Sequence, residues 1–138
     1  MKYMLMLRAS SATEAAGRPD ADDLNAMGAF NERLIKAGVL LAGEGLESSA
    51  TGARVEYDGA ERHVTDGPFA ETQELISGFW ILQVASRDEA IEWARRVPLH
   101  EGRIEVRRVL ELDDFDPDNE YVRKEVEWRE QTGRSRTA

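Results

Sequence analysis

Two ionisable residues in the middle of the chain, His63 and Asp66, have the side-chain types of an acid–base pair and lie three positions apart. An imidazole that is oriented by a carboxylate can act as a general base near neutral pH. A bend between the two residues would bring their side chains together, whereas a straight strand places residues an odd number apart on opposite faces. An exposed histidine in a hairpin is therefore the first expectation, and a catalytic His63–Asp66 pair is the alternative.

Glu44 is the third candidate for catalytic chemistry, because it stands between Gly43 and Gly45 directly after an apolar run. A carboxylate at the end of a strand can face a pocket and act as a base, or it can point into water. The residues by themselves leave both readings open.

The segment from Thr65 to Pro68 has the composition of a tight turn. Aspartate can bond the backbone two residues on, glycine accepts unusual backbone angles, and proline fixes φ. A turn does not account for the aromatic and polar residues that follow, and loops on rigid scaffolds often carry binding residues. We therefore predict a ligand-binding loop, with purely structural roles as the alternative. Its expected ligand-binding residues are Gly67, Pro68, Phe69, Glu71 and Thr72.

Metal and nucleotide sites have little support in the sequence. The chain has no cysteine and only 2 histidines, so a zinc or iron site would need an unusual set of carboxylates. The Gly43-Glu44-Gly45 run lacks the third glycine of a dinucleotide-binding motif, and no phosphate-binding GK[ST] motif is present. We predict no metal and no cofactor.

Composition indicates one small domain. The chain has 138 residues, of which 41% are hydrophobic, and the absence of cysteine fits a reducing cytoplasm. The net charge of −9 opposes direct nucleic-acid binding, which depends on clustered lysine and arginine. The apolar run at the N-terminus is too short for a signal sequence, and no run is long enough to span a membrane. The expectation is a soluble, cytoplasmic protein.

The spacing of apolar residues predicts an alternation of strands and helices. Helices are expected over residues 20–37 and between Ser86 and Pro98, the second opened by a capping box of Ser86 and Glu89. Strands are expected at residues 2–7, 39–42, 78–85 and 103–109, with an inserted hairpin over 53–57 and 60–65 around Asp58-Gly59. The strand at 78–85 is apolar on both faces and should be central. This order is the split βαβ arrangement of a ferredoxin-like α+β fold.

Beyond residue 109 the chain leaves this core, so we expect one domain over residues 1–109 and an acidic linker with a helical tail over 110–138. The acidic run from Glu111 to Glu120 contains no basic residue. It is interpreted as a solvated segment, with a cation-binding loop as the alternative. Asp116-Pro117 is expected to open a helix that reaches about Gln131 and places Tyr121 and Trp128 on one face.

The run HVTDGPFAETQE at residues 63–74 resembles the DGPF signature of the YCII-related family, in which the run AETKE follows the signature. Gln73 stands where that run usually carries lysine. Four further pieces agree with the resemblance and extend it over residues 1–109: MKYM at the start, GEGL at 43–46, EAIEWA at 89–94 and GRIEVR at 102–107.

The resemblance implies a ferredoxin-like domain that pairs through its sheet into a dimeric α+β barrel, and therefore a homodimer. It also implies an association with extracytoplasmic-function sigma factors, beside which bacterial members often sit. Enzymes of the broader group carry a histidine on the first helix and an aspartate in an Asp-Pro pair after the second. Here residues 20–37 contain no histidine and Val97 precedes Pro98, so that dyad is not carried over.

Two functions remain in view. The first is a dimeric small-molecule-binding or regulatory protein, which the missing dyad favours. The second is a cofactor-independent enzyme of the lyase or dehydrochlorinase type, with acid–base chemistry on a small polar or aromatic substrate. A pocket that gathers the ionisable candidates would favour the enzyme, and their dispersal in solvent would favour the binding protein.

Overall fold

The computed structural model describes residues 1–16 and 18–133. It contains six strands: β1 Lys2–Arg8, β2 Leu40–Gly45, β3 Ala53–Asp58, β4 Glu61–Asp66, β5 Ile76–Gln83 and β6 Ile104–Arg108. The helices are α1 Ser11–Ala16, α2 Ala21–Lys36, α3 Arg87–Arg95 and α4 Glu120–Thr132, with short 3-10 turns at Ser49–Thr51, Thr72–Glu74 and Leu112–Asp114.

Four strands form an antiparallel sheet in the order β2-β5-β1-β6, and β3 and β4 form a separate two-stranded hairpin. The order β1–α2–β2 and then β5–α3–β6 confirms the predicted ferredoxin-like α+β fold with an inserted hairpin. The apolar strand β5 lies inside the sheet between β2 and β1, as predicted.

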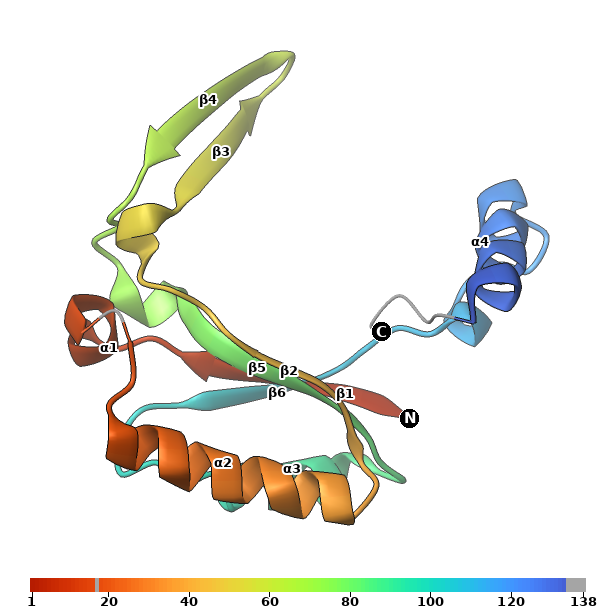
Figure 1. Cartoon of the computed structure of the whole chain (residues 1–138). Coiled ribbons are helices and arrows are strands. Elements are labelled where there is room, and N and C mark those ends of the chain that lie inside the picture. The colour runs from red at the N-terminus through yellow and green to blue at the C-terminus, as the bar shows by residue number, and fades with distance from the viewer. Residues whose placement is uncertain (17, 134–138) are drawn as a thin grey trace.

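The hydrophobic core lies between one face of this sheet and the helices α2 and α3 (Figure 1). The sheet contributes alternate residues of its central strands, among them Leu5 and Leu82, because successive side chains of a strand point to opposite faces. From α2, Phe30 packs edge-on against the ring of Trp80 with 5.6 Å between ring centroids. The indole N–H of Trp80 donates to the side-chain oxygen of Asn31 at 2.8 Å, so its polar group is satisfied.

Both core helices begin where the sequence indicates. The carboxylate of Asp20 accepts from the backbone N–H of Asp23 at 2.8 Å, and Ser86 Oγ accepts from that of Glu89 at 3.1 Å. The predicted capping box is half right, because the Glu89 carboxylate accepts from the N–H of Ala85 instead of that of Ser86.

Several predicted boundaries are wrong. The strand expected at residues 39–42 continues through Gly45, because pairing with β5 keeps this glycine-containing run extended. The hairpin turn is Gly59-Ala60, since Asp58 still pairs with Glu61. The expected loop after β1 contains the short helix α1. The extension of β2 depends on pairing with a strand more than 30 positions away, which local propensity does not report.

The C-terminal tail is held to β6 by an ion pair. The guanidinium of Arg108 donates two hydrogen bonds to the carboxylate of Asp114, at 2.9 and 3.0 Å, and that carboxylate also accepts from the N–H of Glu111 at 2.8 Å. The hydrogen bond from Arg108 is the main reason why the pKa of Asp114 lies below its usual value. The tail therefore leaves the sheet in a defined direction.

The tail helix α4 starts later than the sequence predicted. Its N-cap is Asn119, whose side chain accepts from the N–H groups of Tyr121 and Val122, whereas Asp116 forms a local turn with the N–H of Asp118. Tyr121 and Trp128 remain 72% and 48% exposed. No helix in the described part of the chain is long and apolar enough to cross a membrane.

Because only one side of α2 faces the core, replacing leucine by alanine should lower the free energy of unfolding more on that side than on the exposed side. Leu34→Ala removes a side chain that is 0% exposed, and it should lower the free energy of unfolding by about 3 kcal/mol because a cavity remains. Leu24→Ala, at a side chain 59% exposed, should change it by no more than about 0.5 kcal/mol. Urea unfolding followed by circular dichroism measures both, and equal losses would contradict the described core.

Candidate functional site

The DGPF segment, residues 66–69, joins the hairpin to the rest of the domain, and one glycine in it is required by a close contact. A Cβ atom at Gly67 would lie 1.7 Å from the carbonyl oxygen of Ser49 and 2.6 Å from its carbonyl carbon. The backbone N–H of Gly67 donates to the carbonyl of Gly52 at 2.9 Å. Glycine is needed here because only a residue without a side chain lets the two backbones approach so closely.

The next residues of the segment are also tied to the 49–54 region. The N–H of Phe69 donates to Ser49 Oγ at 3.1 Å, and the guanidinium of Arg54 lies 4.0 Å from the centre of the Phe69 ring. The peptide between Gly67 and Pro68 is cis. Phe69 is half-buried by these contacts.

Glu14 of α1 completes this cluster, which we call the Ser49 clamp: Glu14, Ser49, Gly67 and Phe69. The Glu14 carboxylate accepts from the hydroxyl of Ser49 at 2.5 Å, from its backbone N–H at 3.1 Å and from the hydroxyl of Ser48 at 3.4 Å. The Ser49 hydroxyl bond is the main cause that lowers the pKa of Glu14, although partial burial works against it. A carboxylate with a lowered pKa is a weaker base, and it already accepts a hydrogen bond from the Ser49 hydroxyl. The contacts of the Ser49 clamp therefore have a structural role: they connect α1, the 49–54 region and the DGPF segment.

The sequence did not indicate Glu14, Ser49 or Arg54 as members of this site. Ser49 and Phe69 are 20 positions apart, and Glu14 and Ser49 are 35 apart. No spacing rule connects residues at such separations, and the serine-rich run at 48–49 has the composition of an ordinary loop.

The three predicted catalytic residues are exposed and lie apart in the fold. His63 and Asp66 are both on β4, where their odd separation in a paired strand turns them to opposite faces. Glu44 is on β2 at the edge of the main sheet. Their side chains do not converge.

Within the hairpin, His63 lies beside other potential metal ligands. Its Nε2 is 3.3 Å from a carboxylate oxygen of Glu61, and one ligand atom each from Asp58, Glu61 and His63 lie within 4.8 Å of one another. All three side chains are exposed on the hairpin, as charged groups of a solvated ribbon commonly are, and we assign no metal to them.

The other predicted binding residues come directly after the DGPF segment in the sequence. Glu71 is exposed and precedes the 3-10 turn Thr72–Glu74, and Thr72 is half-buried. Two open hollows lie elsewhere, along the tail; the first is lined by Leu112, Phe115 and Val126 among others, and the second by Lys2, Val109 and Arg129 among others. Neither hollow is lined by a predicted site residue.

The sheet face opposite the helices, which we call the open face, carries an apolar centre. Strand alternation places Met4 and Met6 of β1 and Phe79 and Ile81 of β5 on it, because their neighbours Leu5 and Trp80 enter the core. Both core helices lie on the other side of the sheet (Figure 1).

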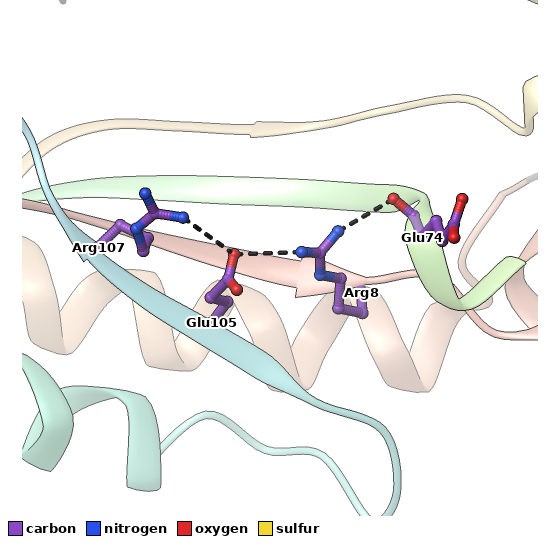
Figure 2. A network of polar contacts seen from close by, with 4 residues as sticks. All are labelled: Arg8, Glu74, Glu105 and Arg107. Carbon is purple, nitrogen blue, oxygen red and sulfur yellow. Dashed lines mark hydrogen bonds and ion pairs between the residues drawn. The ribbon is translucent and has the colours of Figure 1, made fainter.

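A charged cluster lies at one edge of the open face, and Figure 2 shows its members in a row. Arg8 donates to the carboxylate of Glu105 at 3.1 Å and to the backbone carbonyl of Glu74 at 3.0 Å, while Arg107 lies 3.9 Å from the same carboxylate. The side chains of Arg8, Glu105 and Arg107 are 26%, 40% and 70% exposed. This Arg8–Glu105–Arg107 cluster ties the segment after the DGPF signature to the sheet.

Comparison with known proteins agrees with the predicted family. The model of the YCII-related domain matches residues 1–113, and the chain therefore belongs to the YCII-related family. An uncharacterised protein of Rhizobium meliloti is 30% identical over 97 residues, which are 69% of this chain and 78% of that protein.

Among solved structures, the 5-chloro-2-hydroxyhydroquinone dehydrochlorinase of Burkholderia phenoliruptrix, in complex with 2,5-dihydroxybenzoquinone, aligns with a TM-score of 0.48 at 14% identity. The alignment covers 84% of this chain and 100% of that one. At this identity the likeness carries nothing about the reaction.

The clamp predicts a strong effect of the smallest substitution at Gly67. Gly67→Ala forces a backbone shift against Ser49 and should cost about 2 kcal/mol of stability, with loss of amide protection in the hairpin. Gly52→Ala in the same region is the matched control, because its Cβ would be 3.5 Å from the nearest atom and the backbone there is extended. Urea unfolding and hydrogen exchange measure both, and equal behaviour of the two variants would refute the close contact.

The lowered pKa of Glu14 predicts a pH dependence of stability. Because the folded pKa lies below the unfolded one, the Glu14 contribution is complete above the unfolded pKa of about 4.5 and is lost as the pH falls through the folded value. Between about pH 6 and pH 3, the wild type should therefore lose more stability than Glu14→Gln. Asp114 titrates in both proteins and cancels in the difference. Parallel urea-unfolding profiles would show that the Glu14 contacts contribute nothing.

Proposed function

We propose that the protein is a homodimer whose two open sheet faces pack against each other, and that it binds a small molecule between them. The observation that carries this proposal is the apolar centre of the open face, formed by Met4, Met6, Phe79 and Ile81 and bordered by charged residues at the sheet edges. An antiparallel sheet that faces water normally presents polar side chains there. An apolar centre with a polar rim is the usual composition of a protein interface.

The chemistry of the open face supports a ligand with a flat apolar body and a polar group. Methionine side chains adapt to irregular shapes, and the Phe79 ring offers a surface for stacking. At the edges, Glu44 and Arg107 can bind polar substituents of either sign. The 3-10 turn Thr72–Glu74, which follows the DGPF segment, borders this space through the hydrogen bond from Arg8 to the Glu74 carbonyl.

The enzymatic alternative has less support. Its candidate residues Glu44, His63 and Asp66 are exposed on β2 and on both faces of β4. At the positions that resemble the dyad of family enzymes, α2 has no histidine and Val97 is a core residue 7% exposed. Neither the family match nor the relative supports an association with a sigma factor.

The dimer is tested on the open face. Met6→Glu places a charge in the apolar centre and should convert the dimer into a monomer with an unchanged circular dichroism spectrum, because a buried unpaired carboxylate opposes association. Leu24→Glu, on the exposed side of α2, should leave the dimer intact. Sedimentation velocity at micromolar concentration measures both. A monomeric wild type would exclude the dimer.

The ligand is tested by thermal shift with a library of small aromatic and polar metabolites. A compound at a hundred times its dissociation constant should stabilise the dimer by roughly 2.7 kcal/mol. The effect should be lost in Phe79→Ala and retained in Leu24→Ala. Hits that Phe79→Ala keeps would place the ligand elsewhere, and turnover of a hit would favour the enzyme.

A further inference from the structure

We propose that the two subunits of the dimer are related by a two-fold axis parallel to the strands, so that Glu44 of each subunit meets the Arg8–Glu105–Arg107 cluster of the other. This proposal rests on the proposed homodimer and adds which sheet edges meet. Three observations support it: the strand register, the charges of the two sheet edges, and the unpaired carboxylate of Glu44.

The register places the two edges at the same level along the strands. Glu44 on β2 pairs with Phe79, Phe79 pairs with Met6, and Met6 pairs with Glu105 on β6. The four residues form one row across the open face, from the β2 edge to the β6 edge. Arg107 lies one row away, opposite Met4, and Arg8 lies beyond Met6 at the end of β1.

The two edges carry opposite charge. The cluster holds two guanidinium groups and one carboxylate, so it has a net charge of +1. At the other edge, Glu44 pairs with β5 through its backbone, and its carboxylate makes no hydrogen bond or ion pair with any residue that the structure describes. Arg107 is 70% exposed, and its 3.9 Å contact with Glu105 leaves donors available.

Two symmetry operators can bring the open faces together with aligned strands, as in most face-to-face sheet packings. A two-fold axis that lies between the sheets and runs perpendicular to the strands places each sheet edge over the same edge of the other subunit. Glu44 then faces the edge that carries the other Glu44, and the cluster faces the edge that carries the other cluster. An axis along the strands exchanges the edges and keeps the rows level, so that Glu44 reaches the row of Glu105, between the two arginines of the other subunit. The second operator brings Glu44 to the level of Glu105, with Arg8 and Arg107 on either side, so that it meets a cluster of net charge +1. The first operator brings edges of like charge together, and like charges at an interface oppose association.

This arrangement gives each dimer two equivalent contacts, as an isologous interface requires. It also accounts for Glu44, the most isolated of the predicted catalytic residues, as a group that orients the second subunit. Any ligand between the sheets would then be bordered at each edge by residues of both subunits.

Charge reversal tests the proposal. Glu44→Arg and Arg107→Glu should each weaken dimerisation about tenfold, because both contacts become repulsive. The double variant restores opposite charges at both contacts and should dimerise within about threefold of the wild type. Glu92→Arg and Arg87→Glu, exposed on α3, reproduce the changes in net charge away from the open face and should have little effect. Sedimentation equilibrium at low salt measures all five dissociation constants beside that of the wild type.

Unchanged dimerisation of both single variants would overturn the proposed operator, and so would a double variant weaker than either single one. If a reversed variant fails to fold, the neutral pair Glu44→Gln and Arg107→Gln supplies the same double-mutant cycle, whose coupling must be favourable. A monomeric wild type would instead refute the dimer itself, and the two failures are therefore distinct.

Discussion

The packing of α2 and α3 against one face of the sheet is the contact on which the rest of the molecule depends. Phe30 and Leu34 of α2 meet Leu5, Trp80 and Leu82 of the central strands, and these side chains are almost completely removed from water. Burial of apolar surface is the main favourable term in folding. Neither core helix lies on the opposite face of the same strands, whose centre is also apolar; there Ile81 is 4% exposed, and Met4, Met6 and Phe79 are half-buried. This second apolar surface is the feature on which the proposed dimer rests.

The family signature has a physical explanation in the Ser49 clamp. Gly67 allows a backbone contact that no other residue permits, and Phe69 is held by Ser49 Oγ and by the Arg54 guanidinium. Glu14 of α1, 35 positions before Ser49, accepts hydrogen bonds from Ser49 in turn. The hairpin has no core of its own, and an isolated two-stranded ribbon is marginally stable in water. The DGPF segment therefore attaches the hairpin to the rest of the domain.

Charged residues are arranged differently on the hairpin and on the open face of the sheet. On the hairpin, charged groups are solvated and pair with neighbours, as His63 does with Glu61. On the open face, Glu44 and Arg107 stand on the edge strands, and Lys2 and Arg8 stand at the two ends of β1, so these charges surround the apolar centre. Charges at the rim of an interface contribute to orientation and to the association rate more than to affinity. Glu44 and the cluster on β6 fit that role better than they fit proton transfer.

The sequence by itself determined the order of strands and helices, the N-caps Asp20 and Ser86, the central position of β5 and the family, because each follows from local spacing or from a contiguous motif. It did not determine α1 or the extension of β2 through Gly45, which depends on pairing with β5. It also missed the start of α4, where Asn119 and not Asp116 caps the helix. The site was decided almost wholly by tertiary structure. Arg8 and Glu105 are 97 positions apart, and Glu14 and Ser49 are 35 apart. Such contacts form only once the strands have paired in their register, and the type and local sequence of either residue do not predict them.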